Sequence, residues 1–127
     1  HSAVYITKKV ALQNSATALK VLLNGNIQAE ADIKVLFKIL PSASAEDFDD
    51  LEYQFFNDDG SPDNAVNVSL TPGDFQEYEF TAGVKDDGFT GTELPDFIQF
   101  AIKIVLQSTN AAQPPRVKDL RAIALAY

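Results

Sequence analysis

The sequence contains no cysteine, tryptophan or methionine, and its one histidine is the first residue. Without cysteine the chain can form no disulfide, no thiolate nucleophile and no cysteine-based zinc or iron–sulfur site. Ser-His-Asp and Cys-His catalysis and histidine-bound zinc also lack their central residue, because we interpret His1 and Ser2 as left over from expression cloning. Phosphate-binding and esterase motifs such as G-x-x-x-x-G-K-[ST] and G-x-S-x-G are missing. We therefore expect a protein that is not an enzyme.

Long apolar runs are missing too. The run at residues 104–106 (IVL) is far shorter than the roughly 20 residues that cross a bilayer, so no membrane partner is expected. The 127 residues include 9 Phe and 4 Tyr, which is enough for one hydrophobic core and too little chain for two. We expect residues 3–127 to form one soluble β-sandwich domain, excised from a longer protein.

Charge is unevenly distributed along the chain, whose net charge is −8. Residues 30–96 carry 17 acidic and 3 basic side chains, whereas residues 97–127 carry 4 basic and 1 acidic. An acidic belt of this size repels phosphates, so nucleic acid is not an expected partner. Its simplest interpretation is a set of solvated loops that keep the protein soluble.

Alternation of apolar and polar residues is the main structural signal. In residues 33–39 (IKVLFKI) every second residue is apolar and both lysines fall on the opposite face, which indicates a half-buried strand. Similar signals recur in segments 19–23, 51–56, 66–70, 75–81, 97–106 and 117–127. About eight strands without a long helix predict two antiparallel sheets packed face to face, as a jelly-roll-like sandwich or, alternatively, an immunoglobulin-like one. Segments 19–23 and 33–39 could form a hairpin.

A loop rich in Asp and Asn at residues 57–64 is the one candidate metal site. Hard cations such as calcium prefer several loop oxygens, and the candidate ligands are Asn57, Asp58, Asp59 and Asp63. The spacing departs from D-x-[DN]-x-[DN]-G and no glutamate closes it. The alternative is an acidic turn held by Asx hydrogen bonds. No cofactor is expected apart from this possible calcium.

Two aromatic residues in acidic or glycine-rich surroundings are candidates for sugar binding. Phe48 and Phe89 could stack on a glycan if they are exposed. Carboxylates beside Phe48 could in principle serve a glycosidase, but solvated acids keep ordinary pKa values, which makes that reading remote. A glycan-binding module for host-surface recognition is therefore the alternative function.

The last third of the chain carries a family resemblance. Residues 97–106 (FIQFAIKIVL) and 114–125 (PPRVKDLRAIAL) resemble the C-terminal part of large virion structural proteins of T4-like tailed phages, particularly marine ones. Residues 33–41 (IKVLFKILP) and 47–50 (DFDD) are similar to the same domain. The resemblance implies a non-catalytic component of the phage particle, associated with baseplate, neck or fibre, that contacts other virion proteins or itself.

Charged residues of the final segment are candidates for such contacts. The Pro114-Pro115 step delivers Arg116 to the strand start, and Lys118, Asp119 and Arg121 could form a charged network near a sheet edge. We expect Arg116, Lys118 and Arg121 either to contribute to an inter-subunit interface or to be solvent-exposed charges that bind no partner. Location in the virion follows from the resemblance alone.

Overall fold

The computed structural model describes residues 2–28, 31–43, 47–64, 66–71, 73–83, 94–108 and 115–126. Within these ranges the chain contains strands and two single-turn 3₁₀ helices, and no α-helix. The strands are β1 (Ser2–Ile6), β2 (Val10–Ala16), β3 (Ala18–Asn26), β4 (Ala31–Pro41), β5 (Gln54–Phe55), β6 (Gln76–Ala82), β7 (Phe97–Ser108) and β8 (Arg116–Leu125). The 3₁₀ helices are η1 (Phe48–Asp50) and η2 (Phe56–Asp58). The prediction of an all-β fold is confirmed.

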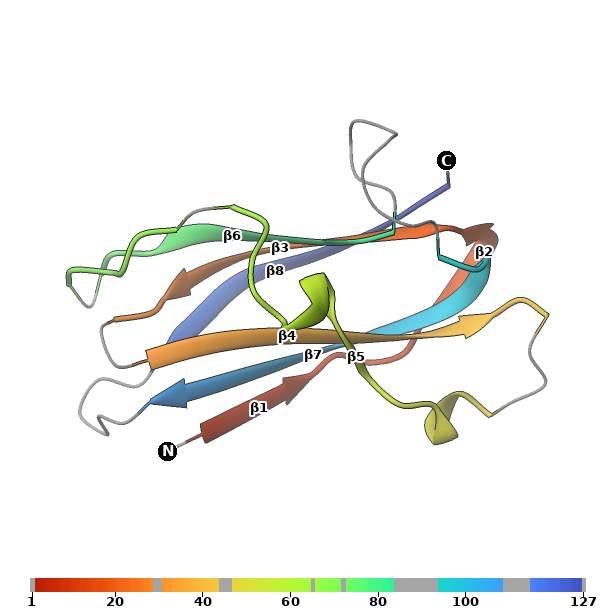
Figure 1. Cartoon of the computed structure of the whole chain (residues 1–127), viewed down its shortest axis with the longest axis horizontal. Coiled ribbons are helices and arrows are strands. Elements are labelled where there is room, and N and C mark those ends of the chain that lie inside the picture. The colour runs from red at the N-terminus through yellow and green to blue at the C-terminus, as the bar shows by residue number, and fades with distance from the viewer. Residues whose placement is uncertain are drawn as a thin grey trace.

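The strands form two antiparallel sheets that pack face to face (Figure 1). Sheet A has the order β1-β7-β4-β5, and β2 pairs with β7 beyond the end of β1; sheet B has the order β6-β3-β8. The orders β2-β7-β4-β5 and β8-β3-β6 are those of a jelly roll, in which the chain alternates between two sheets. A jelly roll would place the first strand beside β8. Here β1 pairs with β7 instead, and no other strand of the described structure pairs with the outer edge of β8.

Alternation explains why these segments become strands around one core. In β4 the residues Ile33, Val35, Phe37 and Ile39 are buried, and the residues between them are partly exposed. Their partners on β7 are likewise apolar, with Val35 opposite Ile104. From sheet B the core receives Leu19, Val21, Leu23, Tyr78 and Phe80. Each such large side chain contributes about 1.5–3 kcal/mol by leaving water, which makes the register of the central strands firm.

The expected hairpin between segments 19–23 and 33–39 is wrong. β3 pairs with β6 and β8 in sheet B, whereas β4 pairs with β5 and β7 in sheet A. β3 and β4, although consecutive along the chain, thus lie in opposite layers. The long connection between them was the signal against a tight hairpin, because hairpin loops usually have two to five residues.

Two further strand predictions need correction. Residues 66–70 are not a strand: Val68 and Leu70 are 52% and 85% exposed, and Ser69 anchors the segment by hydrogen bonds with the backbone of Ile27. The predicted strand 51–56 shrinks to β5, because the chain turns at Phe56 into η2. Strands β1 and β2 were not predicted, since their apolar residues lie on an edge and are largely exposed.

Candidate interaction surface

One side of the sandwich, between β4 and β6, is closed by η2. Phe56 at the start of η2 is fully buried, with its ring centroid 4.8 Å from Phe37 of sheet A and 6.0 Å from Phe80 of sheet B. Tilted aromatic contacts of this kind add to the gain from burial. In Figure 1, η2 lies between the two layers at this side. A single aromatic side chain therefore plugs the gap between the sheets.

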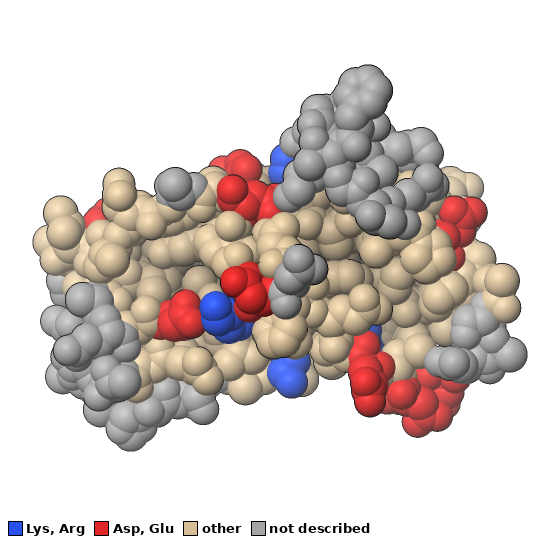
Figure 2. Space-filling model, viewed as in Figure 1, with Lys and Arg blue, Asp and Glu red and all other residues tan. Residues whose placement is uncertain are grey.

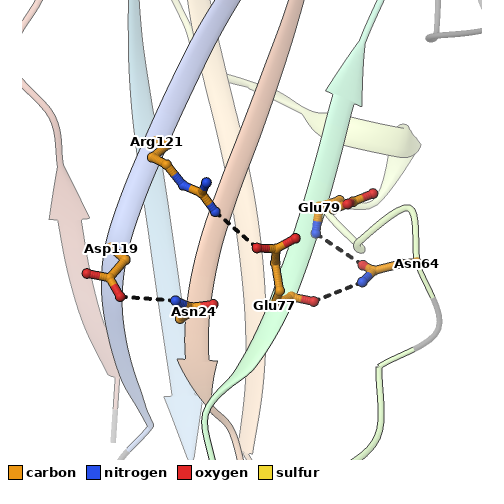
Figure 3. A network of polar contacts seen from close by, with 6 residues as sticks. All are labelled: Asn24, Asn64, Glu77, Glu79, Asp119 and Arg121. Atoms are coloured by element: carbon orange, nitrogen blue, oxygen red, sulfur yellow. Dashed lines mark hydrogen bonds and ion pairs between the residues drawn. The ribbon is translucent and has the colours of Figure 1, made fainter.

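The loop after η2 also covers the strand edges on this closed side. Asn64 donates from Nδ2 to the carbonyl of Glu77 at 2.8 Å and accepts from the amide of Glu79 at 3.1 Å, so its side-chain amide replaces a neighbouring strand (Figure 3). The Asp63 amide donates to the carbonyl of Glu79 at 2.6 Å. On β4, the amide of Val35 donates to the carbonyl of Gly60. Residues of one loop thus pair with the edges of β6 and β4. Their hydrogen bonds satisfy backbone groups that could otherwise pair with another chain.

Replacing Asn64 by alanine tests this edge cover. The two hydrogen bonds to the β6 backbone are lost, so we expect the free energy of unfolding to fall by about 1–2 kcal/mol. Urea unfolding followed by circular dichroism measures the change. Asn67→Ala is the matched control, because Asn67 is exposed and makes no hydrogen bond within the described structure. Equal stability of the two variants would show that Asn64 does not hold the loop on the edge.

Among the described residues, no side chain plugs the opposite side, between β1 and β8, in this way. Tyr5 lies opposite the buried Ile104 and faces the layer between the sheets, yet it is 57% exposed. On β8, Leu120 is 36% exposed and Ala122 is exposed, although Ala122 lies opposite the fully buried Val21. An open pocket of about 240 Å³ separates the two strands at this point. We call Tyr5, Leu120 and Ala122 with this pocket the open side.

A β-bulge divides β8 into two parts. Leu22 pairs with Arg121 and Asn24 pairs with Lys118, so Asp119 and Leu120 together oppose a single residue of β3. Asp119 has a φ of 55°, in the left-handed region that aspartate tolerates better than most residues, and its carboxylate accepts a 3.0 Å hydrogen bond from Asn24. The strand therefore bends at Asp119 and resumes a regular path from Leu120 onwards.

The cations of β8 lie where sequence reasoning placed them, but their contacts differ. Arg121 reaches across β3 to Glu77 on β6, at 3.0 Å, rather than to Asp119 (Figure 3). Lys118 lies over the ring of Phe75 at 4.1 Å. Arg116 is exposed at the start of β8. The predicted network among Lys118, Asp119 and Arg121 is therefore wrong, because at the bulge these side chains diverge and contact Phe75, β3 and β6, respectively.

The described side chains of the acidic loop form hydrogen bonds within the loop. Asp59 accepts from the amide of Ser61 at 2.9 Å, Asn57 donates to the carbonyl of Ser61 at 2.8 Å, and Asn57 also donates to Asp63. The hydrogen bond from the Ser61 side chain and the one from its amide lower the pKa of Asp59. No group of three acids or histidines that could hold an ion occurs among the described residues, and the side chain of Asp58 lies outside them. These hydrogen bonds are of the kind expected for the alternative, an acidic turn held by Asx contacts.

Calcium therefore stays a prediction with a simple test. Because the oxygens of Asp59 and Asp63 already accept hydrogen bonds, we expect millimolar calcium to leave the melting temperature unchanged within about 1 °C, relative to chelator. Differential scanning fluorimetry measures it, with magnesium as the control for ionic strength. A rise of several degrees with calcium alone would restore the metal site.

Phe48 is buried, and the expectation of an exposed stacking ring there is wrong. It is 4% exposed, and Lys38 and Lys9 lie over its ring at 4.5 and 5.7 Å. Asp47 caps η1 by accepting from the amide of Asp49, which turns the Phe48 ring under the lysines. A ring covered by two lysines offers no face to a sugar. Phe89, the other candidate, lies outside the described residues.

Two tyrosines of the described structure have a raised pKa. Burial raises the pKa of Tyr53, and burial together with the charge of Asp74 raises the pKa of Tyr78. Both tyrosines have packing roles, since Tyr53 lies under Lys38 and Lys103 and Tyr78 belongs to the core.

Sequence reasoning did not identify the open side. Its residues come from β1 and from the inward row of β8, and neither has a chemical motif. The available signal was the alanine-rich inward row of residues 120–126, since small side chains on a core-facing row leave space unfilled. Charge gave a second signal: Asp and Glu are prominent on the face that carries β4, β6 and η2 (Figure 2), whereas β8 is rich in cations.

Comparison of the chain with family models, with curated proteins and with solved structures found no match. In the described parts of the chain, no helix has the length and apolar character needed to span a bilayer. The observations that bear on function are therefore the geometry of the two sides and the resemblance of the last third of the sequence.

Proposed function

We propose that this chain is a non-catalytic structural module that joins protein subunits of a tailed-phage particle through the open side. The observation that carries the proposal is the exposure of core-facing side chains on β1 and β8. Tyr5 and Leu120 border an unfilled pocket, while the equivalent gap on the other side is filled by Phe56. Apolar interior surface left in water is characteristic of a site that another protein covers.

The two sides also differ in whether loop residues form hydrogen bonds to their strand edges. Loop residues Gly60, Asp63 and Asn64 pair with the edges of β4 and β6, whereas β8 beyond the bulge has no such cover among the described residues. An uncovered edge is a template for contact with another chain. The phage setting is supported by the resemblance of residues 97–106 and 114–125 to virion structural proteins.

Purified particles of the phage that encodes the chain provide the test. We expect mass spectrometry to detect the tryptic peptide 104–116 in structural-protein amounts. Hydroxyl-radical footprinting should oxidise Tyr5 and Leu120 in the free chain and spare them in the particle. Leu70, which is 85% exposed in the loop that precedes β6, serves as the reactivity standard in the free chain.

Two results would overturn the proposal. One is absence of peptide 104–116 from particles, and the other is equal oxidation of Tyr5 and Leu120 in both states. A glycan array separates the alternative function: binding that survives washing and competes with free sugar would favour host recognition. We expect the array to be silent, because the one described candidate ring, Phe48, is covered by Lys9 and Lys38.

A further inference from the structure

No described residue pairs with the outer edge of β8, so this edge can bind another chain. A strand edge offers alternating amides and carbonyls, and the group that satisfies them is another extended chain. Leu125 turns its carbonyl towards the β3 side, where it accepts from the amide of Thr17 at 2.8 Å. Because backbone groups alternate along a strand, Ala122 and Ala124 direct theirs to the free edge.

We propose that the occupant is a second copy of this chain, paired through antiparallel β8 strands about a two-fold axis at Ile123. This inference rests on the proposed function and names its partner. Ala122 of each copy would then face Ala124 of the other, and these are the two residues whose backbone groups point outwards. Sheet B, with three strands, becomes a continuous sheet of six across the dimer.

Side-chain chemistry favours this register. The two copies of Ile123, 43% exposed on the outer face of sheet B, would lie opposite each other, and Arg121 would lie opposite Leu125 of the partner copy. No like charges are then directly opposed, which would be destabilising across a strand pair. The cations Arg116 and Lys118 precede the bulge at Asp119, so they lie outside the paired segment.

Repulsion between two copies of the chain differs from one surface to another. Each copy has a net charge of −8, so most pairs of surfaces repel each other. Residues 120–125, which would form the strand pair, carry a single charged side chain, Arg121, so charge repulsion between the two copies is small there. Arg121 is already paired with Glu77 and Lys118 already lies over Phe75, so neither cation requires an acidic partner protein.

Sedimentation velocity over a concentration series tests the proposal with the full chain. A contact of one short strand pair is small, so we expect a monomer–dimer equilibrium with a dissociation constant on the order of 10–100 µM. Ile123→Lys and Ile123→Glu each place like charges on the axis and should weaken the dimer at least about tenfold. Mixing these two variants should restore dimers, which native mass spectrometry identifies as heterodimers.

Leu70→Lys is the matched control, because it introduces the same charge at an exposed apolar site outside the paired segment 120–125 and should dimerise like the original chain. Unchanged circular dichroism and melting temperature establish that each variant folds. A wild-type monomer at every concentration, or dimers that persist in both Ile123 variants, would overturn the inference. Protection of Tyr5 and Leu120 in particles, combined with a monomer in solution, would retain the proposed function and assign the edge to a different protein.

Discussion

Replacing Phe56 by alanine is expected to lower the free energy of unfolding by about 3–5 kcal/mol. The side chain is fully buried between Phe37 and Phe80, so its removal leaves a cavity that touches both sheets. It also frees η2 and the loop whose Gly60, Asp63 and Asn64 cover the edges of β4 and β6. Chemical denaturation with urea measures the loss.

The neighbouring Phe55 supplies the control for this substitution. Phe55 is 49% exposed on β5, so Phe55→Ala should cost less than about 1 kcal/mol. If Phe55→Ala and Phe56→Ala lowered the free energy of unfolding equally, the packing of the closed side would depend on the loop backbone rather than on the ring of Phe56.

The second large effect is expected at Gly83, where Gly83→Ala should cost about 2–4 kcal/mol. Gly83 has a φ of 90°, and a Cβ placed there would lie 2.8 Å from the carbonyl oxygen of Thr17 and 3.0 Å from Cα of Ala18. These backbone atoms belong to the point where the chain crosses from sheet A to sheet B, so they cannot move without disturbing both layers.

Gly73→Ala is the comparison for that experiment. A Cβ at Gly73 meets nothing within 4 Å, and its φ is not positive. We expect a change within about 1 kcal/mol, with slight stabilisation if the unfolded chain loses freedom. Thermal unfolding of both variants in parallel reports the difference. A tolerated alanine at position 83 would contradict the close approach at the crossing.

Much of the fold could be predicted because the central strands alternate strongly. β4 and β7 face solvent on one side and the core on the other, so Val35 and Ile104 reveal both the strands and their inward faces. Pairing could not be predicted, since alternation does not specify which strand lies next to which. Residues 66–70 resembled a strand but bind through Ser69 to Ile27, a long-range contact that no local pattern reports.

Of the candidate interaction surface, only residues of β8 were named from the sequence. The cations of β8 were identified as possible interface residues, but the bulge at Asp119 and the ion pair between Arg121 and Glu77 depend on β3 and β6. Tyr5 became part of the open side because β1 pairs with β7 and not with β8. β1 could pair either with β7 in sheet A or with β8 in sheet B. The alternation of apolar and polar residues in β1 would be the same in both positions, so the sequence does not distinguish them.

Residue-resolved amide exchange in dilute solution, where the chain is a monomer, compares the two sides of the sandwich most directly. The amides of Glu79 and Val35 are covered by Asn64 and Gly60, and we expect them to exchange slowly. The amides of Ala122 and Ala124, which point to the free edge of β8, should exchange much faster. Equal protection of all four amides would contradict the open side, and with it the surface through which we expect this module to bind.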